Sequence, residues 1–133
     1  MKCWGSNGSG QLGLGHVTNL GDEPGEMGNA LPALDFGTTQ KVKSMSMGPA
    51  SNCVIFEDAQ MKCWGYNLYG QLGLGDALNR GDGPAEMGDA LPAVDLGLNA
   101  TTTITQMCCG LHTCAVLNTG QILKLDSGGK ETK

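Results

Sequence analysis

The chain has 133 residues, a formal net charge of −5 and 22 glycines. This length suits one domain with a modest core, and so much glycine without a Gly-X-Y period excludes collagen and predicts tight turns between short strands. The acidic balance argues against a nucleic-acid partner, since phosphate binding needs clustered lysine and arginine, and no apolar run approaches the roughly 20 residues that cross a bilayer.

One stretch of the sequence is repeated at an offset of sixty residues. Residues 1–15 read MKCWGSNGSGQLGLG, and residues 61–75 read MKCWGYNLYGQLGLG. A fixed period of this length is typical of repeat architectures, in which each unit shields its neighbour. We predict a first repeat at residues 1–60, a second repeat with a degenerate closing strand at residues 61–126, and a polar tail at residues 127–133.

The first residues do not indicate a compartment. Lys2 is followed by no apolar stretch and no small-residue cleavage site, so the sequence shows no signal peptide. Met1 stands where Met61 stands in the second repeat, so truncation of a longer protein is an open alternative. The localisation is therefore left unassigned.

The first repeat predicts short strands between glycine-rich loops. Residues 1–4 are expected to form a strand, and residues 6–15 a turn in which glycines supply positive φ angles. Residues 16–29 lack helical periodicity and contain Pro24, so a long loop is expected there. Further strands are expected at residues 34–36, 42–47, 53–56 and 60–64, and the continuously apolar 53–56 is typical of a central strand covered on both faces.

The second repeat follows the same outline and ends differently. The hairpin turn at residues 118–120 places Gly120 where a left-handed conformation is wanted. The closing strand is degenerate, because Leu125 stands where Trp64 stood and Asp126 where Gly65 stood. Four short antiparallel strands per period are typical of a propeller blade, and here they are expected at residues 94–96, 103–109, 113–117 and 121–125.

The order of motifs resembles the repeat of the regulator-of-chromosome-condensation family. The resemblance is carried by G-x-H-T-C-A at residues 110–115, K-C-W-G at 62–65, Asn67 and G-Q-L-G at 70–73. It implies an all-β fold of propeller blades, each a four-stranded antiparallel sheet, with seven blades in a typical ring. Two such repeats make an incomplete propeller or a fragment of a seven-bladed one. We therefore expect the chain to self-associate or to belong to a longer chain that completes the propeller.

Three residues that suggest ligand binding or catalysis are interpreted as structural. Trp4 and Trp64 are expected to fill the gap between blades, as large rings usually do, and not to stack on a ligand. His112 has no nucleophile placed beside it by a recognisable motif, so it has nothing to activate; the resemblance implies a blade-structuring role. We expect no enzyme activity and no cofactor.

The cysteines leave two outcomes open. Cys53 and Cys63 are equidistant from Asp58, so a hairpin that turns there sets them opposite each other, with Cβ atoms roughly 4.5–5.5 Å apart. Either they remain buried free thiols, or they form a disulfide, which would favour an oxidising compartment. Cys108 and Cys109 are adjacent on a strand and point to opposite faces, so no zinc site is assigned.

The long loops carry four acidic candidates for contact with a partner. These are Asp22 and Glu26 in the first repeat and Asp82 and Glu86 in the second. Carboxylate oxygens suit calcium, but the spacing lacks the alternation of an EF-hand, so no metal site is assigned and calcium stays an open alternative. Loops on a rigid scaffold commonly carry recognition.

The function predicted from these features is a non-catalytic scaffold for protein–protein interaction. Its contact surface is expected to be the loops at residues 6–29 and 66–89, and the protein partner is not identified. The resemblance also implies an alternative, guanine-nucleotide exchange on a small GTPase as part of a larger protein of the same family. No basic face or exchange wedge is recognisable in the sequence.

Overall fold

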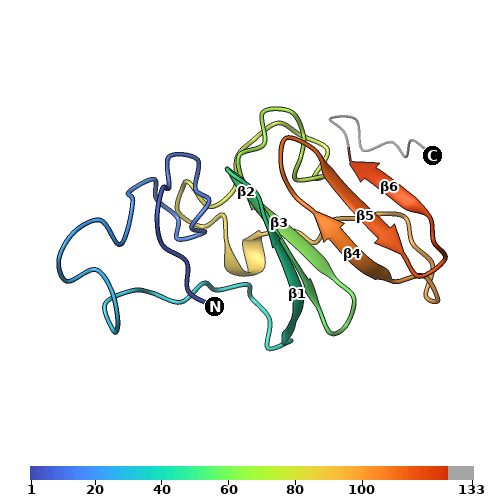
Figure 1. The fold of residues 1–133 in the computed structure, drawn as a ribbon, viewed down its shortest axis with the longest axis horizontal. Coiled ribbons are helices and arrows are strands. Elements are labelled where there is room, and N and C mark those ends of the chain that lie inside the picture. The colour runs from blue at the N-terminus through green and yellow to red at the C-terminus, as the bar shows by residue number, and fades with distance from the viewer. Residues whose placement is uncertain (126–133) are drawn as a thin grey trace.

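The computed structural model describes residues 1–125, so the predicted tail at residues 127–133 lies outside the described part. Within that part the chain is all-β, with two three-stranded antiparallel sheets and one short 3-10 turn, η1 (Gly88–Ala90) (Figure 1). The all-β prediction is confirmed. The first sheet consists of β1 (Val42–Met47), β2 (Ser51–Phe56) and β3 (Met61–Gly65), and the second of β4 (Ile104–Cys108), β5 (Thr113–Leu117) and β6 (Ile122–Leu125).

Strands β2 and β3 of the first sheet are buried on both faces, whereas the edge strand β1 is largely exposed. Side chains alternate between the faces of a strand. Cys53 and Ile55 of β2 therefore point towards the second sheet, while Val54 and Phe56 point towards residues 1–41, the N-terminal segment. In Figure 1 the N-terminal segment and the second sheet lie on opposite flanks of the first sheet. Every residue of β2 and β3 is buried as a result.

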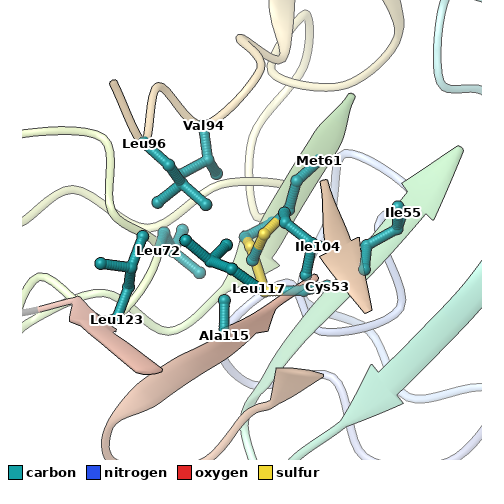
Figure 2. Packing of buried hydrophobic residues seen from close by; sticks show 11 residues of the cluster. Cys53, Ile55, Met61, Leu72, Val94, Leu96, Ile104, Ala115, Leu117 and Leu123 are labelled. Atoms are coloured by element: carbon teal, nitrogen blue, oxygen red, sulfur yellow. A yellow bond between two sulfur atoms is a disulfide. The ribbon is translucent and has the colours of Figure 1, made fainter. Parts of the chain in front are cut away.

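Two apolar clusters fill the spaces on either side of this sheet. In the first, Ile104, Ala115 and Leu117 of the second sheet lie against Cys53 and Met61 of the first (Figure 2). Each large apolar side chain buried in this way contributes roughly 1.5–3 kcal/mol. The second cluster joins the N-terminal segment to the opposite face of the first sheet and contains Cys3, Leu12, Leu34, Phe36, Val54, Phe56, Trp64 and Leu91.

The sheets have three strands where the sequence predicted four. Residues 34–36 form no strand: the Leu34 N–H donates one hydrogen bond of 2.9 Å to the Met1 carbonyl, and no ladder follows. The equivalent Val94 N–H donates to the Met61 carbonyl at 2.8 Å. Each segment is too short to pair further, because a proline precedes it and a glycine with positive φ turns the chain away directly after it.

The strand predicted at residues 1–4 is also absent. In the second repeat the equivalent strand, β3, pairs with β2 along its length. The described chain offers residues 1–4 no such neighbour, and their one backbone hydrogen bond is the one from Leu34. A strand is defined by its partner, so this segment stays irregular until the bridge between Gly5 and Leu20.

The first sheet is tied to the N-terminal segment by polar side chains as well as by apolar packing. Asn52 Nδ2 and Trp64 Nε1 both donate to the Gln11 carbonyl, at 2.7 and 3.0 Å. The buried Lys62 ammonium donates to the carbonyls of Phe36 and Gly88, at 2.7 and 3.1 Å. The bonds from Trp64 to Gln11 and from Lys62 to Phe36 join the second repeat to the first.

The two sheets are joined by hydrogen bonds of serine side chains. Ser51 Oγ donates to the Gly110 carbonyl at 3.1 Å, and Ser46 Oγ accepts from the Cys109 N–H at 3.0 Å. Gly48 lies against this junction, where a Cβ would crowd the Cys109 carbonyl. The described part contains no helix with the length and apolar content needed to cross a membrane.

The hairpin turn of the first sheet places an alanine in a left-handed conformation. Ala59 has φ 68°, and its N–H donates to the Phe56 carbonyl at 3.0 Å. The same position of the second hairpin is held by Gly120, with φ 82°. A left-handed backbone is unfavourable for an L-residue and not for glycine.

We therefore expect Ala59→Gly to raise the free energy of unfolding by about 0.5–1 kcal/mol. Urea denaturation followed by tryptophan fluorescence measures the change. Ala93→Gly, at an exposed position without positive φ, is the control and should not stabilise the chain. A loss of stability in Ala59→Gly would contradict the argument.

Candidate protein-interaction surface

Two long loops of the same shape project from the repeats. The first leaves at Gly5 and returns at Leu20, where the two residues exchange backbone hydrogen bonds of 2.7 and 3.2 Å. The second leaves at Gly65 and returns at Arg80 with bonds of 2.8 and 3.1 Å. In Figure 1 the second loop, which follows β3, extends past the end of the first sheet. Because each loop is closed at its base, its shape is set largely by its own residues.

One buried asparagine organises each loop. Asn67 is fully buried, and its Nδ2 donates to the carbonyls of Asp76 and Leu78, at 3.1 and 2.9 Å. Its Oδ1 accepts from the Leu72 N–H at 2.9 Å, and its own N–H donates to Asn79 Oδ1 at 2.9 Å. A single amide thus satisfies several backbone groups that no strand pairs.

The first loop uses Asn7 in the same way. Asn7 is fully buried, its Nδ2 donates to the carbonyls of His16 and Thr18, at 2.7 and 2.9 Å, and its Oδ1 accepts from Leu12 N–H at 2.9 Å. Its own N–H donates to Asn19 Oδ1 at 2.9 Å. The two loops therefore share one bonding scheme, although their exposed residues differ.

The first loop is pressed against the second repeat. The Gly15 N–H donates to the Gly81 carbonyl at 3.0 Å. Gly10 approaches the Asp82 backbone so closely that a Cβ would overlap it, and its φ of 72° is also left-handed. Glycine is required at this position on both grounds. The loops thus form one continuous surface.

The glutamates predicted to face a partner are held by their own loops. Glu26 Oε2 accepts from the N–H groups of Gly21 and Glu23, at 2.7 and 3.1 Å, and these backbone hydrogen bonds lower the pKa of Glu26. Glu86 Oε2 accepts in the same way from the N–H groups of Gly81, Asp82 and Gly83, at 3.0, 3.1 and 2.8 Å. Each carboxylate closes a turn of its own loop. Successive backbone N–H groups in a turn form a small anion-binding site, and here the side chain supplies the anion.

The aspartates predicted beside them lie differently. Asp22 is exposed, and Asp82 is half-buried with an oxygen 3.3 Å from Asn79 Nδ2. Among residues 1–125 no three histidine, cysteine, aspartate or glutamate side chains gather where they could hold a metal ion.

The remaining predicted residues also lie apart. Trp64 is fully buried, with its ring 5.3 Å from that of Phe36, whereas Trp4 is 61% exposed. Trp64 is covered by the preceding loop through Gln11, and the described chain places no such loop over Trp4. His112 is exposed in the bend between β4 and β5 and forms no side-chain hydrogen bond to another described residue.

The structure joins Cys53 and Cys63 in a disulfide. The two residues are direct partners in the β2–β3 ladder, both are fully buried, and their Cα atoms are 4.1 Å apart. Cys3 and Cys109 are thiols whose pKa is raised by burial. A raised pKa leaves little thiolate at neutral pH, so these two are poor nucleophiles.

Sequence reasoning missed the residues that hold the loops in shape. No structural role was predicted for Asn7, Asn67 or Lys62, although Asn67 and Lys62 stand in the motifs that carry the resemblance. Glu26 and Glu86 were proposed for contact with a partner, and their hydrogen bonds to their own loops were not foreseen. One signal was available. Each of these positions is polar and carries the same residue type in both copies, while neighbouring positions on the same loops have changed.

Comparisons with known proteins agree with the resemblance seen in the sequence. No family model matches the chain. The chain is 31% identical over 80 residues to the ultraviolet-B receptor UVR8 of Arabidopsis thaliana, covering 60% of the chain and 16% of the receptor. It is 30% identical over 128 residues to the human probable E3 ubiquitin-protein ligase HERC4, covering 96% of the chain and 10% of HERC4.

Among solved structures, the fold resembles that of Prp20p from Saccharomyces cerevisiae. The TM-score is 0.60 at 20% identity, and the match covers 92% of the chain and 27% of Prp20p. At this identity the likeness concerns the fold alone, and the structure matched is a propeller. The chain spans only 16% of the length of the receptor and 10% of that of HERC4. Together these relatives support repeats like those of the regulator-of-chromosome-condensation family.

The bonds of Asn67 predict a specific loss on truncation. Asn67→Ala leaves the buried Leu72 N–H and the Leu78 carbonyl without their partner, so we expect the free energy of unfolding to fall by about 2–3 kcal/mol. Urea denaturation measures it. Asn29→Ala, at an exposed position, is the matched control, and an equal effect of both variants would contradict the role of Asn67.

The disulfide predicts a stability that depends on redox state. It closes a loop with a sequence separation of 10, for which chain entropy gives about 3 kcal/mol of stabilisation. The double variant Cys53→Ala, Cys63→Ala should lose this amount in urea denaturation, while Cys108→Ser, at an exposed thiol, should lose little. If reductant has no effect on the unfolding midpoint of the wild-type chain, the bridge does not stabilise it.

Proposed function

We propose that the chain is a non-catalytic scaffold for protein–protein interaction, built from two repeats of the regulator-of-chromosome-condensation kind. The loops at residues 6–29 and 66–89 are its contact surface. One observation carries the proposal: both loops use the same buried bonding scheme around Asn7 and Asn67, while several exposed side chains differ between them.

A loop held in this way suits recognition. A segment that is ordered before binding loses little conformational entropy when a partner docks, so more of the contact energy appears as affinity. The loops are fastened to the core by Leu12 and Leu72, which are buried in the two apolar clusters. The exposed positions can then change without disturbing the fold.

The two repeats belong, in this proposal, to a longer array that completes a propeller. Strands β2 and β3, covered on both faces, illustrate a unit between two neighbours. Trp4 is exposed, whereas Trp64, at the equivalent position of the second repeat, is fully buried. This difference is expected of a unit that has no preceding neighbour in the described chain. The acidic balance favours a protein partner over nucleic acid.

Site-specific photocrosslinking tests the proposed surface. A photoreactive amino acid is placed at Glu23 or Ala77, both exposed on the loops, and at the exposed Lys43 of β1 as a control. In native extract we expect a discrete adduct from the loop positions and not from residue 43. The protein in the adduct is then identified, purified and mixed with the chain to measure binding directly.

Nucleotide-release assays distinguish the scaffold from the exchange-factor alternative. The chain is added to small GTPases loaded with fluorescent GDP, and we expect no acceleration of release. Accelerated release would replace the scaffold by an exchange factor. Adducts from residue 43 equal to those from the loops would show that the loops are not the contact surface.

A further inference from the structure

An exposed apolar patch distinguishes the second loop from the first. It is formed by Tyr66, Leu68, Tyr69 and Leu78, and we call it the tyrosine–leucine patch. The rings of Tyr66 and Tyr69 meet edge to face with centroids 5.9 Å apart. Leu68, Tyr69 and Leu78 are 59%, 57% and 67% exposed. The Asn67 amide bonds to the Leu78 carbonyl at 2.9 Å, so the four residues lie around one buried hub.

The fold does not need these apolar side chains. The first loop makes the same bonds around its own asparagine with Ser6, Gly8, Ser9 and Thr18 at the four equivalent positions. Large exposed apolar residues that gather in one place commonly mark an interaction site. Tyrosine is also a frequent anchor of protein interfaces, because it supplies a large contact area at a low entropy cost.

The patch borders a groove with an acidic wall. Leu78 lines this groove with Ala85 and Ala90, and its volume is about 380 Å³. Arg80 also lines it, but its guanidinium is paired with Asp76 at 2.6 Å. Asp82, on the same groove, has no ion-pair partner among the described residues.

The charge around the patch has one dominant sign. The charged side chains that line the groove beside Leu78 are Arg80, Asp82 and Glu86, and Arg80 is the one cation among them. Because that cation is already paired, the field beside the patch is negative. Such a field attracts a positively charged partner and repels an acidic one.

We propose that the tyrosine–leucine patch binds a protein segment in which a large apolar side chain is flanked by lysine or arginine. The apolar side chain packs against Tyr69 and Leu68, and the basic residue lies over the groove at Asp82. This inference rests on the proposed scaffold function and names the chemistry of its partner. The first loop, with the same backbone scheme and without the apolar residues, lacks this specificity.

The repeat itself supplies the variant that tests the proposal. The graft Tyr66→Ser, Leu68→Gly, Tyr69→Ser, Leu78→Thr gives the second loop the residues of the first at all four positions. A folded loop with these residues already exists in the same chain, so the graft should keep its structure. Circular dichroism and urea denaturation confirm that it does.

The probe is a display library of random dodecapeptides selected on the whole wild-type chain. We expect enriched peptides to combine leucine, phenylalanine, methionine or tryptophan with a neighbouring lysine or arginine. Synthetic versions should bind the graft at least about tenfold more weakly than the wild type, because interface anchors of this kind have effects of that size. Asp82→Asn should weaken binding several-fold and reduce its salt dependence.

The reciprocal graft gives an independent readout. In the grafted chain, the first loop receives the residues equivalent to Tyr66, Leu68 and Tyr69 by the substitutions Ser6→Tyr, Gly8→Leu and Ser9→Tyr. Gly8 has no positive φ and no atom within 4 Å of its Cβ position, so leucine fits there. We expect part of the lost peptide binding to return.

Several outcomes would overturn the proposal. These are an acidic consensus among the enriched peptides, peptide binding that is unchanged in the graft, and no enriched peptide at all. Binding of the wild-type chain to phosphatidylcholine vesicles that the graft abolishes would assign the patch to a membrane. Concentration-dependent dimerisation that the graft abolishes would assign it to a second copy. Loop-specific photocrosslinks that persist in the graft would leave the scaffold function standing while this inference fails.

Discussion

The fold depends on the burial of strands β2 and β3 on both faces of the first sheet. Cys53 and Ile55 are sealed by the second sheet, while Val54, Phe56 and Trp64 are sealed by the N-terminal segment. A hairpin of two short strands is at best marginally stable by itself, so β2 and β3 rely on the apolar contacts that both neighbours supply. The Trp64 indole adds direction to this packing, since its N–H donates to the Gln11 carbonyl and fixes how the preceding loop lies on the sheet.

The long loops help to cover the sheets, because Leu12 and Leu72 pack in the apolar clusters. Most of the backbone of these loops lies outside the strands and is not paired in a ladder. Backbone groups outside the strands need hydrogen-bond partners. The buried Asn7 and Asn67 provide them inside the loops, and Glu26 and Glu86 provide them nearer the surface. Two of the acidic side chains proposed from the sequence for contact with a partner, Glu26 and Glu86, thus also hold their own loops in shape. What remains exposed on the loops is free to differ between the repeats, and the tyrosine–leucine patch of the second loop is the main difference.

Sequence reasoning was most reliable where the hydrophobic pattern was strong. The strand predicted at residues 42–47 has the bounds of β1 (Val42–Met47), and the strand predicted at residues 113–117 has those of β5 (Thr113–Leu117). It was wrong at residues 1–4, 34–36 and 94–96, where a local apolar pattern suggested strands. Those segments lack a neighbour to pair with or turn away after one hydrogen bond, and neither fact is visible in local composition.

The sequence alone determined the repeat, its period, the all-β class and the opposition of Cys53 to Cys63, because each depends on spacing along the chain. The tertiary structure alone decided that identical residues have different surroundings: Trp64 is fully buried and Trp4 is 61% exposed. It also decided that Glu86 binds its own loop amides while Leu68 and Tyr69 point to solvent. Burial and hydrogen bonding depend on which segments meet in space, and residues 41 or 53 positions apart meet here only after the chain has folded.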